Sequence, residues 1–163
     1  MSKEASQSVA ESTSVDFGPL LGRFDFALDP KKRLTIPSGW RDVFVSGVVY
    51  VMPDRKEKCL NLYPKAEMDS FFGQLRQKAL LDPALNRVYA KIGAVSQQLL
   101  FDVQGRIRIS DKLLQFANLT TTVAMVGAFR MVKLYAPEVL GPADDVSVES
   151  LGEIDEALTA AGL

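Results

Sequence analysis

Self-similarity of the chain limits its possible folds more than any other feature. Residues 24–37 match residues 97–110 at an offset of 73 positions, and both segments carry Asp-x-x-x-Arg at the same place. The apolar runs and the Leu-Tyr pairs that follow also recur in the same order. Such a repeat predicts two related units that share one core. We therefore predict an α+β, β-rich fold with two tandem halves, residues 19–64 and 95–137.

Alternation of apolar and polar residues predicts strands in each half. In the first half, Phe24, Phe26 and Leu28 alternate with polar side chains, and Leu34 and Ile36 continue the pattern after a turn. This alternation is typical of a half-buried β-hairpin. A short helix and two further strands should follow. We expect the order strand, turn, strand, short helix, strand, strand in both halves.

Three other segments complete the predicted organisation. Residues 65–94 carry apolar side chains at helical spacing and predict two linking helices, the second starting at Pro83. Their apolar stripes should pack on the sheet or contact a neighbouring subunit. Residues 1–18 are polar and Ser-rich, which predicts a disordered arm. Residues 138–163 form an acidic tail with helical tendency near residues 153–158.

Composition excludes several classes of protein. The 163 residues include one cysteine and no histidine, which excludes disulfide frameworks, zinc sites of Cys and His, and His-based general base catalysis. No acid/base pair, activated nucleophile or metal cluster is found, so we expect no enzyme, no cofactor and no small-molecule substrate. Cys59 and Trp40 should be packing residues. No apolar run is long enough to cross a bilayer, and we expect a cytoplasmic protein.

Charge is distributed unevenly along the chain. The net charge is -1, but from Glu138 onward there are seven acidic and no basic residues. Residues 1–137 therefore hold 19 basic and 13 acidic side chains. This positive balance is compatible with a nucleic-acid partner.

The repeated Asp-x-x-x-Arg segments supply the candidate binding residues. For a single turn, an ion pair that merely closes the turn is the simpler interpretation. Two such turns together can present guanidinium groups to successive parts of a DNA groove, as β-ribbon readers do. The expected DNA-binding set is Arg33, Arg106, Lys31, Lys32, Asp29, Asp102, Arg23 and Arg108.

Two segments, Leu28–Pro37 and Phe101–Ile109, resemble the signatures of the MraZ family. These bacterial transcriptional regulators contain two copies of the swapped-hairpin module found in transition-state regulators. The resemblance covers about residues 20–137. By this resemblance, Arg33 and Arg106 are the leading DNA contacts.

The resemblance also implies an assembly and a target. The two halves would interleave into one barrel, and several chains would form a homo-oligomeric ring. The ring would bind double-stranded DNA at direct repeats in the promoter of the division and cell-wall gene cluster, in association with the nucleoid. Lys32 departs from the family, which usually has Gly there, and the tail lacks the usual aromatic residue.

Two alternatives to sequence-specific DNA binding remain open at this point. One is a ring-forming scaffold whose hairpins bind protein while the acidic tail competes for the basic face. The other is an antitoxin-like module that binds DNA through the same fold and blocks a small protein partner through another segment.

Overall fold

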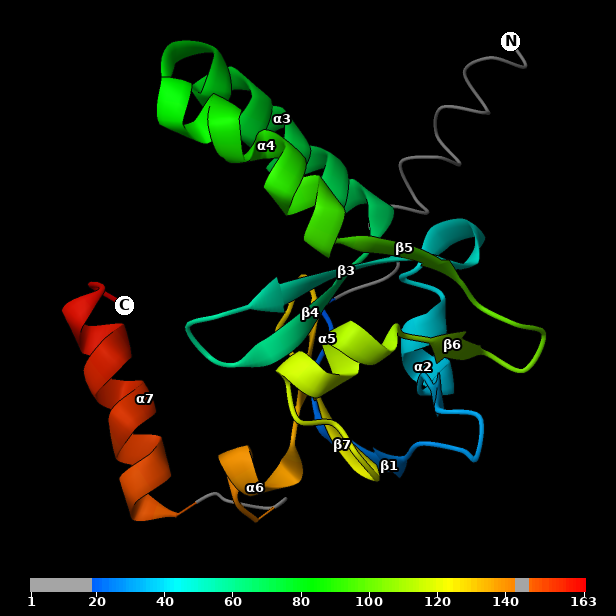
Figure 1. Cartoon of the computed structure of the whole chain (residues 1–163). Helices are drawn as coiled ribbons and strands as arrows, with labels where there is room; N and C mark the ends of the chain where they lie inside the picture. Colours follow the sequence, from blue (N-terminus) through cyan, green and yellow to red (C-terminus); the bar gives the residue numbers. More distant parts are fainter. Residues whose placement is uncertain (1–18, 143–146) are drawn as a thin grey trace, which may run out of the picture.

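A computed structural model describes residues 19–142 and 147–163 of the chain (Figure 1). The fold is α+β, as predicted. Six antiparallel strands form one sheet in the order β1 (Arg23–Ala27), β7 (Thr122–Gly127), β8 (Val132–Tyr135), β4 (Cys59–Tyr63), β3 (Val48–Asp54) and β5 (Gln97–Leu100). Two short strands, β2 (Arg33–Thr35) and β6 (Arg106–Arg108), form a separate antiparallel ribbon.

Strands from the first part of the chain pair with strands from the second. β1 pairs with β7, β5 pairs with β3, and β2 pairs with β6. The predicted pairing of β1 with β2 in a local hairpin is therefore wrong. β2 has only three residues, and its pairing with β6 puts Leu34 opposite Ile107, so that both side chains enter the core. Among the described strands, β1 and β5 are the sheet edges, so no closed barrel is formed by backbone pairing.

The main core lies between the ribbon, the sheet and two short helices. α2 (Ser38–Arg41) contributes Trp40, which is buried and donates its indole N–H to the carbonyl of Leu21 at 3.2 Å. The prediction that Trp40 is a core residue is confirmed. A 3-10 turn, η1 (Val45–Gly47), then leads into β3. α5 (Asp111–Phe116) is capped by Ser110, whose hydroxyl accepts from the Leu113 amide at 3.4 Å.

The two linking helices form a helical hairpin of α3 (Lys65–Leu81) and α4 (Pro83–Val95). Asp82 caps α4 by accepting from the Ala84 amide at 2.9 Å, and Phe72 packs edge-on against Tyr89 with ring centroids 5.9 Å apart. Figure 1 shows this pair projecting away from the sheet. α3 contacts α4 and also β3 and β4, so part of the predicted packing on the sheet occurs through α3. Several apolar side chains of the pair stay exposed, namely Phe71, Phe72, Leu80, Leu81 and Val95.

Two helices follow the last strand. α6 (Pro137–Leu140) packs beside β7, and α7 (Val148–Ala160) stands clear of the sheet at the side opposite β6 (Figure 1). The predicted disordered arm, residues 1–18, lies outside the described residues. In the ranges that the structure covers, no helix is long and apolar enough to span a bilayer.

Candidate nucleic-acid interface

The register of the β2–β6 ribbon gathers three arginines on one face. Arg33 lies opposite Arg108, and Thr35 lies opposite Arg106. Side chains alternate between the two faces of a strand, and directly opposed residues share a face. Since Leu34 and Ile107 are buried beneath the ribbon, the arginines and Thr35 lie on its outer face.

The turn before β2 is organised by one carboxylate. Asp29 Oδ1 accepts from the backbone amides of Lys31 at 2.9 Å and of Arg33 at 2.7 Å. Asp29 Oδ2 accepts from Nε of Arg33 at 2.6 Å. The hydrogen bond from the Arg33 amide, aided by the Arg33 guanidinium, lowers the pKa of Asp29 despite its partial burial. The carboxylate therefore fixes both the turn and the arginine side chain.

The turn before β6 repeats this arrangement. Asp102 Oδ1 accepts from the amides of Gln104 and Arg106, each at 2.9 Å, and Oδ2 accepts from Nε of Arg106 at 2.7 Å. The hydrogen bond from the Arg106 amide is the largest cause of the lowered pKa of Asp102. Both turns thus contain the ion pair that the simpler interpretation of the sequence predicts.

These ion pairs occupy only part of each guanidinium group. The side chains of Arg33 and Arg106 are 30% and 22% exposed, and each binds its own aspartate through Nε. The terminal nitrogens of Arg33 have no hydrogen-bond partner among the described residues. A held guanidinium with free terminal N–H groups can donate two parallel hydrogen bonds to a phosphate or a guanine.

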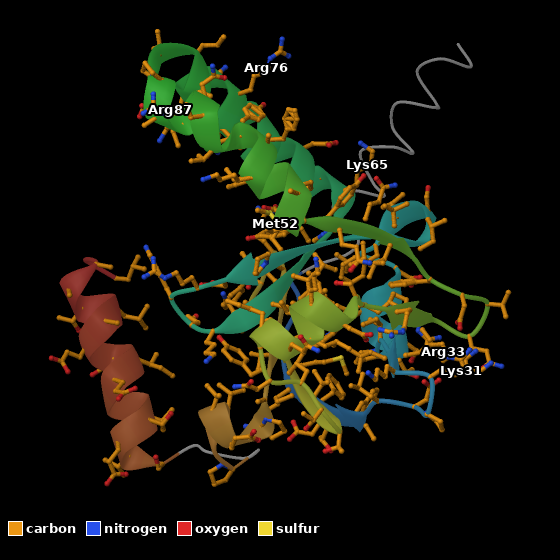
Figure 2. The ribbon with its side chains drawn as sticks, in the orientation of Figure 1. Lys31, Arg33, Met52, Lys65, Arg76 and Arg87 are labelled. Carbon is orange, nitrogen blue, oxygen red and sulfur yellow. The ribbon has the colours of Figure 1, made fainter. Side chains whose placement is uncertain are left out.

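Further cations surround the ribbon. Lys31 and Lys32 are exposed in the first turn, and Lys32 Nζ lies 3.5 Å from a carboxylate oxygen of Asp111. Arg108 donates to the same carboxylate at 2.9 Å and to the carbonyl of Ile109. The hydrogen bond from Arg108, with the nearby Lys32 charge, lowers the pKa of Asp111. Figure 2 shows Lys31 and Arg33 far from Arg76 and Arg87, which lie toward the other end of the α3–α4 hairpin.

Arg23 is the member of the predicted set that lies elsewhere. It begins β1 in the six-stranded sheet, and its guanidinium donates to both carboxylate oxygens of Asp25, at 2.8 and 3.0 Å, and to the carbonyl of Pro142 at 3.1 Å. Its side chain is 15% exposed. The structure therefore places Arg23 against the tail and not on the ribbon face.

Arg41 is a basic residue of this region that the predicted set lacks. It ends α2, is half-buried, and donates from Nε to the carbonyl of Ile36 at 2.8 Å. Its guanidinium lies against Gly105 in the second turn. The contact joins residues 64 positions apart. The only sequence signal for Arg41 as a site residue is that it lies near Lys31, Lys32 and Arg33 in the chain.

The other polar cluster in the described residues is at the β3–β4 turn. Lys133 Nζ donates to Asp54 at 3.2 Å and to Asn61 at 3.0 Å, and Tyr135 donates to Glu57 at 3.0 Å. Cys59 is fully buried beside it, and burial raises the pKa of its thiol to about 11. This agrees with the prediction that Cys59 is a packing residue. No group of three metal-ligating side chains occurs in residues 19–142 and 147–163.

Curated relatives identify the family. Transcriptional regulator MraZ of Thermomicrobium roseum is 33% identical over 119 residues, which cover 72% of this chain and 82% of the relative. The chain belongs to the MraZ family. MraZ of Kineococcus radiotolerans is 33% identical over 118 residues, covering 71% of this chain and 79% of the relative. MraZ of Salmonella typhi is 31% identical over 111 residues, covering 66% and 73%. No family model matches the chain.

Proposed function

We propose that this MraZ-family chain is a DNA-binding transcriptional regulator whose β2–β6 ribbon and adjoining turns contact double-stranded DNA. The observation that carries the proposal is the alignment of Arg33, Arg106 and Arg108 on one face of a two-stranded ribbon. A two-stranded ribbon fits the width of the major groove. The names of the relatives, all transcriptional regulators, support the same function.

The turns explain how two side chains can read DNA at a low entropic cost. An arginine loses substantial rotamer freedom when it is immobilised by a ligand. Here Asp29 and Asp102 hold Arg33 and Arg106 through Nε before any ligand arrives, so part of that loss is incurred on folding. Lys31 and Lys32 would neutralise phosphates, whereas the held arginines would read base edges.

The proposal includes a homo-oligomeric ring of chains with two interleaved swapped-hairpin halves. The exchange of strands between the two parts of the chain supports the interleaving. Exposed apolar side chains support an oligomer, because a monomer seldom leaves such surface uncovered. Leu80 and Leu81 at the tip of the helical hairpin are 78% and 89% exposed, and α7 exposes Leu151, Ile154 and Leu158.

The proposed target is direct-repeat promoter DNA of the division and cell-wall gene cluster, bound in the cytoplasm at the nucleoid. The proposed ring would link several ribbons in one assembly. Linked ribbons can bind successive DNA repeats with increased avidity, which fits a direct-repeat target. Neither a cofactor nor a catalytic step is part of this function.

Titration of such promoter DNA by fluorescence anisotropy tests the proposal. We expect Arg33→Ala and Arg106→Ala each to weaken binding by about 1–3 kcal/mol if they read bases, and the double variant to abolish specific binding. Arg87→Ala, on the distant α4, is the matched control and should bind as the parent does. A correctly assembled double variant that retains specific affinity would exclude the ribbon as the contact surface.

A further inference from the structure

The two Asp-x-x-x-Arg turns share a backbone conformation but differ in the residue that precedes the arginine, Lys32 in the first turn and Gly105 in the second. The amide of Lys32 donates to the Asp29 carbonyl at 2.8 Å, and the amide of Gly105 donates to the Asp102 carbonyl at 3.0 Å. Both residues have positive φ, 60° for Lys32 and 77° for Gly105. The first turn therefore carries a cation at this position, whereas the second has no side chain there.

Arg41 occupies the space that a side chain of Gly105 would need. A Cβ built on Gly105 would lie 2.3 Å from both Cζ and Nε of Arg41 and 2.7 Å from its Nη1. The amide of Ile36 donates to the Gly105 carbonyl at 3.0 Å, and the Ile36 carbonyl accepts from Arg41 Nε at 2.8 Å. Ile36 thus links the helix that carries Arg41 to the second turn.

The terminal nitrogens of Arg41 are available to a ligand. Its Nε donates to Ile36, and no hydrogen bond or ion pair of its Nη1 or Nη2 occurs within the described part of the chain. The equivalent cation in the first turn, Lys32, meets Asp111 only at 3.5 Å with both side chains 57% exposed, an ion pair too weak to prevent a phosphate contact.

We infer that Arg41 is a further DNA-contacting residue, which supplies to a phosphate at the second turn the positive charge that Lys32 supplies at the first. The inference rests on the proposed function. It also gives Gly105 two reasons to be glycine, since its φ is positive and the Arg41 guanidinium lies where a Cβ would be.

The first test is the salt dependence of DNA binding by the full chain. Each phosphate contact contributes about 0.9 to the slope of log affinity against log salt concentration. We expect Arg41→Gln to reduce the magnitude of the slope by about 0.9 and to weaken binding to every DNA sequence by a similar factor. Arg87→Gln removes an equal charge from the distant α4 and should leave the slope unchanged.

The second test moves the charge from α2 to the turn. Arg41→Ala combined with Gly105→Lys puts lysine where the first turn has Lys32, whereas Arg41→Ala combined with Gly105→Asn puts a neutral residue that also tolerates positive φ. We expect the lysine variant to restore most of the lost salt dependence of DNA binding and the asparagine variant to restore none of it. Both variants lack Arg41, so the comparison holds even if loss of its bond to Ile36 lowers the melting temperature.

The outcomes separate the two proposals. An unchanged slope in Arg41→Gln, with parental binding otherwise intact, would overturn the inference and leave the proposed function standing. Equal restoration by lysine and asparagine would show that Arg41 acts only on the shape of the turn. Parent protein whose binding to DNA does not depend on salt would overturn both proposals.

Discussion

Arg106 Nη1 lies 3.9 Å from Asp29 Oδ2, although the two residues belong to different turns. The same Asp29 oxygen accepts from Nε of Arg33 at 2.6 Å. Asp29 therefore faces two guanidinium groups, whereas Asp102 holds Arg106 alone among the described ion pairs. This shared carboxylate couples the two turns and makes the ribbon face asymmetric.

Neutralising Asp29 should reduce specificity more than neutralising Asp102. Asp29→Asn removes the anchor of Arg33 and the second neighbour of Arg106, but it also adds one positive charge to the face. We expect the ratio of specific to non-specific affinity to fall about tenfold, while non-specific affinity does not fall. Competition with unrelated DNA measures the ratio. Asp69→Asn, which breaks an ion pair with Lys65 on α3, is the control. An equal fall of this affinity ratio in Asp29→Asn, Asp102→Asn and Asp69→Asn would contradict the coupling.

The turn carboxylates should make stability depend on pH in the acidic range. The amide hydrogen bonds and the guanidinium groups of Arg33 and Arg106 lower the pKa values of Asp29 and Asp102 in the folded state. A carboxyl group with a lowered pKa stabilises the fold fully above its unfolded value, and that stabilisation disappears as the pH falls through the folded pKa. The melting temperature of the parent should therefore exceed that of the double Asn variant by a constant amount above about pH 5. This difference in melting temperature should become smaller as the pH falls below the ordinary aspartate pKa. A difference that increases on acidification would contradict the prediction.

Lys32→Gly separates backbone strain from DNA contact. Lys32 has φ of 60°, a conformation that costs a non-glycine residue about 1 kcal/mol, whereas glycine adopts it freely. We expect the free energy of unfolding to stay equal or to rise by up to about 1 kcal/mol. At the same time, the salt slope of DNA binding should fall by about 0.9. Urea denaturation and anisotropy titration on the same preparation measure both; a loss of stability with unchanged DNA binding would contradict the assignment.

Gly127→Ala should strongly destabilise the end of β7. A Cβ at this position would lie 2.6 Å from the backbone carbon of Leu20 and from the backbone nitrogen of Leu21. Backbone atoms cannot move aside as a side-chain end can, so we expect a loss on the order of 2–4 kcal/mol in the free energy of unfolding. Gly93→Ala is the control, because nothing lies within 4 Å of its Cβ position in α4. Gly93→Ala should stabilise the helix by roughly 0.5–1 kcal/mol. Equal changes in the free energy of unfolding for Gly127→Ala and Gly93→Ala would contradict the steric explanation.

Local patterns predicted the helices and turns well because their contacts are close in sequence. Helical spacing and Pro83 predicted α3 and α4, and the repeated pattern predicted the short helices that the structure shows as α2 and α5. The spacing of Asp29 and Arg33 predicted a turn closed by their ion pair, and the structure adds that the carboxylate also accepts from amides two and four residues ahead. In each case, the groups that interact are separated by only a few bonds along the backbone.

The sequence by itself determined the α+β composition, the buried faces of the ribbon strands and the identity of the two arginine-bearing turns, because alternation and turn chemistry act over a few residues. Only the tertiary structure decided that β2 pairs with β6 rather than with β1, that Arg23 lies against Pro142, and that Arg41 covers Gly105. These contacts join segments 64 to 119 positions apart. Their partners are selected by the burial of apolar side chains such as Leu34 and Ile107 in one common core, a quantity that no local pattern contains.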